Sequence, residues 1–217
     1  MKLVIFDLDQ TLINIFRVHD AAFHRTMADV FGLKACYKQM DYTGKRIQDL
    51  IREFALKKGV PSAVIEMNID EAVRVYELCF SALVKNVKKH LLPGVKKLVE
   101  KLSKRHKLAI VTGDLRPIAE TVLKEAGLID YFSVIVTADD APTREKMIRK
   151  AIRKSGKVSE VWVIGDSTRD IDAGKANGAR TIGVMTGEHD RRTLMAHKPT
   201  KVFKDLSNTA KVIEVIG

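Results

Sequence analysis

From about residue 93 onward, amphipathic helical patterns alternate with short apolar runs, and this alternation limits the folds open to the chain. The runs expected to form strands are 107–111, 133–136, 160–164 and 180–184, and glycines end most of the helical patterns between them. Strands separated by helices connect by right-handed crossovers and lie parallel in one sheet. With a further strand at 2–6, the pattern predicts an α/β fold with a doubly wound, Rossmann-like parallel sheet.

Residues 14–90 have a different pattern, with no convincing strand. Apolar residues recur at helical spacing around 21–31, 47–55 and 69–84, and Pro61 is expected to begin a short segment between the second and third patterns. The sequence therefore predicts a helical domain at 14–90, inserted into an α/β core domain made of 1–13 and 91–217.

Two carboxylates stand at the end of the first expected strand. The apolar run Leu3–Phe6 leads directly into Asp7-Leu8-Asp9-Gln10-Thr11. Ligands bind at the carboxyl ends of the strands in an open parallel sheet, and Asp7 and Asp9 share a face if the chain stays extended. Two close carboxylates repel each other unless a cation lies between them. The alternative is an aspartate in a turn followed by an aspartate that caps a helix.

Two later strands also end in polar residues. Leu108–Val111 leads into Thr112-Gly113, and Val161–Ile164 leads into Gly165-Asp166-Ser167-Thr168-Arg169-Asp170. Asp-x-Asp-x-Thr, Thr-Gly and Gly-Asp-x-x-x-Asp, in this order over residues 3–184, resemble three motifs of the haloacid-dehalogenase-like superfamily of phosphotransferases. The superfamily more often has glycine at the position of Gln10.

The remaining motif of this superfamily is a lysine that neutralises the phosphoryl group. Lys146 is the expected residue, in the first turn of a helix that begins near Pro142. Arg144 is its rival, because the spacing from Lys146 to Gly156 is shorter than the usual one. An isolated cation at this place is also compatible with ordinary surface.

The resemblance implies a phosphatase with a helical cap, similar to phosphoglycolate phosphatases, and it assigns roles to the motif residues. Asp7 would be the nucleophile that forms an aspartyl phosphate, and Asp9 the general acid and base. Thr112 and Gly113 would bind the phosphoryl oxygens, although a lone threonine often simply ends a strand.

The resemblance also implies a Mg²⁺ cofactor, a cation that prefers oxygen ligands. Its ligands would be the Asp7 carboxylate, the Asp9 backbone carbonyl and Asp166. Thr11 and Asp170 would support these ligands without being the main ones.

Asp9 and the expected cap both indicate which class of substrate the chain binds. The dehalogenase branch lacks the acid at the position of Asp9, so its presence favours phosphate esters. In the cap, Thr43, Lys45 and Arg46 belong to a polar loop that is expected to bind substrate, although a plain helix start explains it equally well. We expect a small phosphorylated metabolite, with phosphoglycolate-like compounds or sugar phosphates as the first candidates. A phosphomutase of the same superfamily is the rival enzyme.

The net charge of +11 raises the possibility of a nucleic-acid-binding protein. The basic residues are spread over the expected solvent-exposed faces of helices, however, and no aromatic residues lie between them for base stacking. The apolar runs are too short to span a membrane, and Met1-Lys2 leaves no room for a signal peptide. With Cys36 and Cys79 expected to be buried, reduced thiols, the sequence suggests a cytoplasmic monomer or homodimer.

Overall fold

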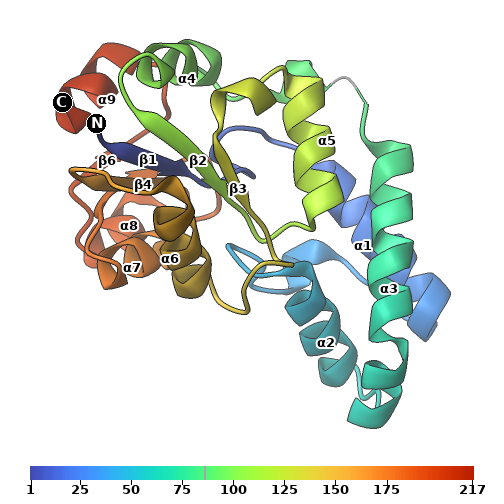
Figure 1. Cartoon of the computed structure of the whole chain (residues 1–217). Coiled ribbons are helices and arrows are strands. Elements are labelled where there is room, and N and C mark those ends of the chain that lie inside the picture. Colours follow the sequence, from blue (N-terminus) through green and yellow to red (C-terminus); the bar gives the residue numbers. More distant parts are fainter. Residues whose placement is uncertain (86) are drawn as a thin grey trace.

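The computed structural model describes residues 1–85 and 87–217, and six strands within them form one parallel sheet (Figure 1). The strand order is β3-β2-β1-β4-β5-β6. The strands are β1 (Leu3–Phe6), β2 (Lys107–Val111), β3 (Val134–Val136), β4 (Val161–Gly165), β5 (Arg180–Val184) and β6 (Lys201–Phe203). The predicted doubly wound α/β fold is confirmed.

Strand β1 lies inside the sheet, and its alternating side chains serve two separate layers of core. Val4 and Phe6 belong to the cluster with α4 (Val95–Ser103), α5 (Arg116–Ala126) and α9 (Thr209–Ile216). Leu3 and Ile5 face the opposite layer, with α6 (Arg144–Ser155) and α7 (Thr168–Ala176). Because all four side chains are fully buried, β1 is apolar throughout, as expected for a central parallel strand.

The carboxyl-terminal part of the sheet was not predicted. Strand β6 pairs with β5 at the edge, and α8 (Arg191–Ala196) packs beside it. An edge strand is half solvated, and Lys201 at the start of β6 is exposed. The segment therefore lacks the continuous apolar run by which the other strands were predicted.

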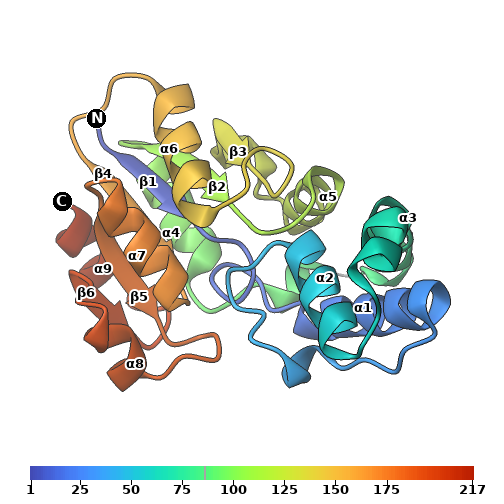
Figure 2. The same cartoon turned by 90° about the horizontal axis from the view of Figure 1, so that it is seen from below.

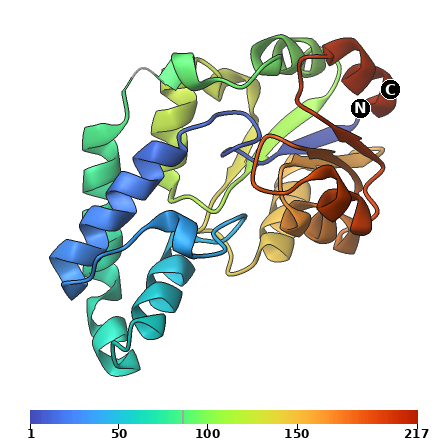
Figure 3. The ribbon, with the colours of Figure 1, turned by 180° about the vertical axis from the view of Figure 1, so that it is seen from behind.

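Beside the sheet, α1 (Phe16–Phe31), α2 (Ile47–Lys57) and α3 (Ser62–Leu83) pack against one another (Figures 2 and 3). Helix α3 begins directly after Pro61, so the separate short segment expected there does not exist. Short 3₁₀ helices lie at Tyr37–Gln39 (η1), Val87–His90 (η2) and Ile129–Tyr131 (η3). None of the helices in the described part of the chain is long and apolar enough to cross a membrane.

The segment before α1 and the segment after α3 connect this helical group to the sheet, and the two lie side by side. Asn14 N–H donates to His90 O and Leu92 N–H donates to Leu12 O, both at 2.9 Å. Cys36 and Cys79, expected to be buried, are free and only half-buried.

Candidate active site

The polar ends of β1, β2 and β4 meet at one pocket, which residues of α1, η1 and the loop before α2 complete. Its volume, which includes space open to solvent, is about 560 Å³. Most of the residues expected at the site from the sequence line it: Asp7, Asp9, Thr43, Lys45, Thr112, Gly113 and Asp166. Most of the candidate catalytic, substrate-binding and metal-binding side chains therefore lie together at the carboxyl edge of the sheet.

Three carboxylates at this edge lie close together. Oxygens of Asp7, Asp166 and Asp170 are all within 4.8 Å of one another, and all three residues are buried. Burial raises the pKa of Asp7 to about 7, although Arg144 acts in the opposite direction; burial also raises the pKa of Asp166. Thr11 lies next to them, its hydroxyl 3.4 Å from Asp166 Oδ1.

The cation of this cluster is Arg144. Its Nη2 donates to Asp7 Oδ1, and its Nε donates to Asp170 Oδ1 at 2.7 Å. One guanidinium leaves three carboxylates with an excess of negative charge. This donor set therefore fits a hard divalent cation such as Mg²⁺. Gly187 leaves room beside it, since a Cβ there would lie 1.8 Å from Asp166 Oδ2.

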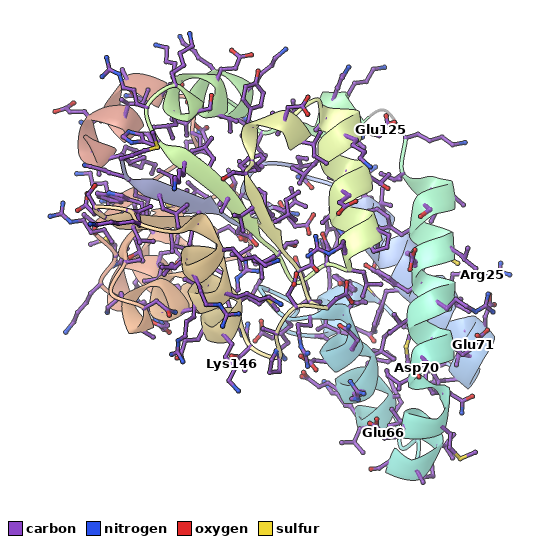
Figure 4. All side chains as sticks on the ribbon, viewed as in Figure 1. Arg25, Glu66, Asp70, Glu71, Glu125 and Lys146 are labelled. Atoms are coloured by element: carbon purple, nitrogen blue, oxygen red, sulfur yellow. The ribbon has the colours of Figure 1, made fainter. Side chains whose placement is uncertain are left out.

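The structure does not bring Lys146 to the cluster. Helix α6 begins at Arg144, which is buried, whereas Lys146 is exposed and its side chain extends away from the sheet (Figure 4). Two residues along an α-helix correspond to a rotation of about 200°, so the two side chains must point to different sides. Arg144, the rival, occupies the position expected for the lysine.

Asp170 has a structural task of its own. It forms a capping box with Ser167 at the start of α7: Asp170 Oδ2 accepts from Ser167 N–H at 3.2 Å, and Asp170 N–H donates to Ser167 Oγ at 3.2 Å. Its other oxygen accepts from Arg144. Asp170 thus joins the start of α7 to the cation beside Asp7.

Asp9 faces a second group of titratable side chains. Its Oδ1 lies 3.1 Å from Nε2 of His19, whose Nδ1 lies 2.6 Å from the Tyr76 hydroxyl. Burial opposes a charge on His19, but Asp9 and Asp114 outweigh it and raise the pKa of His19 to about 9. Burial also opposes ionisation of Asp9, yet His19 lowers the pKa of Asp9 below its usual value. The imidazolium and the Asp9 carboxylate therefore form an ion pair.

The end of β2 meets the helical group at very short range. Thr112 is buried, and its hydroxyl accepts from Asp114 N–H at 3.2 Å, which leaves its own proton for another acceptor. At Gly113 a Cβ would lie 2.2 Å from Lys45 O. Only glycine allows the loop that contains Lys45 to approach this closely.

The polar loop before α2 only partly matches expectation. Thr43 and Lys45 line the pocket, but Lys45 Nζ is paired with Glu53. Arg46 is not among the lining residues and forms a two-pronged ion pair with Asp49 at 2.7 Å. The backbone of this loop, more than its charges, shapes the pocket.

Several lining residues were not identified from the sequence: Phe16, His19, Tyr37, Tyr42 and Asp114. The sequence contained a signal for His19 and for Asp114. Phe16, His19 and Phe23 recur at helical spacing on α1, so a histidine on the apolar face of α1 was visible. Asp114 follows Thr112 by two residues. Tyr37 and Tyr42 lie in η1 and the loop after it, where periodicity gives no signal.

Comparison with known proteins agrees with this arrangement. A family model described as haloacid dehalogenase-like hydrolase matches residues 4–184. The chain belongs to this family. It is 29% identical to a phosphoglycolate phosphatase of Vibrio parahaemolyticus over 223 residues, covering 99% of this chain and 97% of the relative. It is 27% identical to pyrophosphatase PpaX of Bacillus pumilus over 215 residues, covering 97% and 95%.

Solved structures share the whole architecture of this haloacid dehalogenase-like hydrolase. A hydrolase from Pseudomonas syringae superposes with a TM-score of 0.79 at 24% identity, and the match covers 100% of both chains. A haloacid dehalogenase-like family protein from Streptococcus pneumoniae gives 0.72 at 21% identity, covering 99% and 98%. The sequence-based assignment to this superfamily is confirmed, and with it the interpretation as an enzyme of the phosphatase class.

Proposed function

We propose that this hydrolase is a Mg²⁺-dependent phosphatase of small phosphate monoesters that works through a phosphorylated Asp7. The observation that carries the proposal is the shared pocket of Asp7, Asp9 and Thr112, with Asp166 in the same lining. A nucleophile, an acid and donors for phosphoryl oxygens are what phosphoryl transfer needs within reach of one phosphorus atom.

In the first step, an oxygen of Asp7 forms a bond to phosphorus and the ester oxygen–phosphorus bond breaks. Asp9 passes to the leaving alkoxide the proton of the paired His19 imidazolium, whose Nε2 lies 3.1 Å from Asp9 Oδ1. In the second step, water gives a proton to Asp9 and attacks phosphorus. The bond between Asp7 and phosphorus breaks, which releases inorganic phosphate and restores Asp7.

The other residues hold charge and position. Arg144 fixes Asp7 on one side through Nη2 and supplies positive charge beside the nucleophile. Thr112 donates from its hydroxyl. Mg²⁺, held by Asp7, the Asp9 carbonyl oxygen and Asp166, would add positive charge beside the phosphoryl group.

Residues 14–90 act in this proposal as a cap over residues 1–13 and 91–217. The support is that Phe16, Tyr42, Thr43 and Lys45 line the same pocket as Asp7. A pocket roofed in this way admits a small metabolite and excludes a macromolecule. The cap thereby also keeps bulk water from the phosphorylated aspartate.

The test is hydrolysis of p-nitrophenyl phosphate by the purified protein, with and without Mg²⁺. We expect turnover that depends on Mg²⁺, and the Asp7→Asn variant should lose it to below about one thousandth of wild type. Quenched wild-type reactions should contain a phosphorylated peptide with Asp7. Activity above one tenth of wild type in Asp7→Asn would rule out the covalent route, and a phosphorylated isomer in place of released phosphate would indicate a mutase.

A further inference from the structure

One wall of the pocket is aromatic. Phe16, Tyr37 and Tyr42 contact one another there: the ring centroids of Tyr37 and Tyr42 are 4.9 Å apart, and those of Phe16 and Tyr42 are 5.3 Å apart. Phe16 and Tyr42 are partly exposed. Ring faces of this kind pack against flat, weakly polar surfaces and offer little to a small anion.

The cations of this pocket are already engaged. Among the described lining residues they are His19, paired with Asp9, and Lys45, paired with Glu53. A negative charge on the leaving group would have to be desolvated next to carboxyl groups without a free cation to meet it, which is costly.

A buried carboxyl provides the polar contact on this side. Asp114 lines the pocket and is only 6% exposed. Its Oδ2 is buried and has no hydrogen-bond partner among the described residues, an uncommon state for a buried oxygen. A hydroxyl or amino group of a bound molecule would satisfy it.

We propose that this pocket selects phosphate esters whose leaving group is an uncharged ring with hydroxyl or amino groups, and that Asp114 is a specificity-determining residue that binds one of these groups. The proposal rests on the phosphatase function argued above. It predicts discrimination against leaving groups that carry a negative charge of their own, such as the glycolate of phosphoglycolate and the phosphate of pyrophosphate.

The experiment compares kcat/KM for four compounds with that for p-nitrophenyl phosphate. Glucose 6-phosphate and adenosine 5′-monophosphate carry uncharged ring leaving groups; 2-phosphoglycolate and pyrophosphate carry charged ones. At least one ring ester should exceed both charged substrates by about tenfold or more, a difference of about 1.4 kcal/mol, and the better ring ester identifies the kind of ring. Hydrolysis of p-nitrophenyl phosphate together with a preference for a charged substrate would overturn the inference alone. No hydrolysis of any compound would overturn the phosphatase function itself.

Two pairs of variants separate specificity from general damage. Asp114→Ala should reduce kcat/KM for the preferred ring ester about tenfold more than for p-nitrophenyl phosphate, which has no hydroxyl or amino group to bind. Asp114→Asn, which keeps a hydrogen-bonding oxygen, should recover most of that difference. Tyr42→Leu should raise KM for the ring ester more than Tyr42→Phe does, because phenylalanine keeps the ring. Equal losses on all substrates would contradict a role of these residues in specificity.

Discussion

Arg144 is the residue on which the charge balance beside Asp7 depends. Its guanidinium lies between Asp7 and Asp170, and all three side chains are at most 8% exposed. Removing one member of a buried ion pair leaves the others without compensation, which typically costs about 3–5 kcal/mol. Arg144 therefore serves both the stability of the fold and the position of the nucleophile.

We predict that Arg144→Ala lowers kcat/KM for p-nitrophenyl phosphate at least about tenfold more than Lys146→Ala. It should also lower the free energy of unfolding in urea, whereas Lys146→Ala should leave that free energy nearly unchanged because Lys146 is exposed. Arg144→Lys should fall between the two, since a lysine keeps the charge but not the planar guanidinium whose Nε and Nη2 contact Asp170 and Asp7. If Lys146→Ala were the more damaging variant, the structural placement of Arg144 would not reflect its role.

The sequence could not decide between these two residues. Motif order placed a cation near residue 145, but which side chain points inward depends on the residue at which α6 begins. That start is fixed by Thr143, whose hydroxyl accepts from Lys146 N–H at 3.3 Å, and not by Pro142. At Gln10, in contrast, the structure accounts for the glycine that the superfamily more often has: Gln10 has φ of 59°, a conformation that favours glycine.

At the scale of elements, Asp140 joins the loop after β3 to two helices. It accepts from Thr137 N–H at 2.9 Å, is paired with Lys150 of α6 at 2.8 Å, and also pairs with Arg116 at the start of α5. Burial opposes ionisation, but these donors prevail and lower the pKa of Asp140 to about 2. The carboxylate is thus more stable in the folded than in the unfolded chain.

Because the pKa of Asp140 is lower in the folded chain, its ionisation stabilises the fold. This stabilisation is complete above the unfolded-state pKa of about 3.9 and is lost as the pH falls through the folded-state pKa of about 2. We predict that Asp140→Asn lowers the free energy of unfolding by about 2 kcal/mol at pH 7. The difference from wild type should shrink below about pH 4. Urea unfolding at a series of pH values measures this, with Asp130→Asn, an exposed position in η3, as the control. A difference that stays constant down to pH 3 would mean that the charge of Asp140 is not the cause.

The strands inside the sheet were predicted well, and the edge strand β6 was not. Strands β1, β2 and β5 match the expected ranges closely because their apolar runs are buried on both faces. Strand β6 has three residues, and its place at the edge is set by pairing with β5, a long-range contact that local sequence does not encode.

At the scale of the whole molecule, a few contacts hold the loop before α2 against the sheet. Arg169, at the start of α7, is paired with Asp41 at 2.6 Å and also donates to Thr43 O. Nearby, the Tyr42 hydroxyl donates to Glu188 at 2.6 Å. These contacts join segments more than 120 residues apart, which motif order and periodicity could not reveal. They hold the loop that lines the pocket through Tyr42 and Thr43, which is the roof of the pocket in the proposed function, against Arg169 and Glu188.

We predict that Arg169→Ala loosens this roof without affecting the sheet. Amide hydrogen exchange in residues 41–46 should become at least about threefold faster, while exchange in β1 and β4 stays unchanged, because local opening depends on local contacts. KM for p-nitrophenyl phosphate should rise, since the loop would then have to be ordered at the expense of binding energy. Arg74→Ala, which removes an exposed ion pair with Glu71 within α3, is the matched control and should change neither quantity. Unchanged protection of 41–46 in Arg169→Ala would show that close backbone packing alone, as between Lys45 and Gly113, keeps the pocket closed.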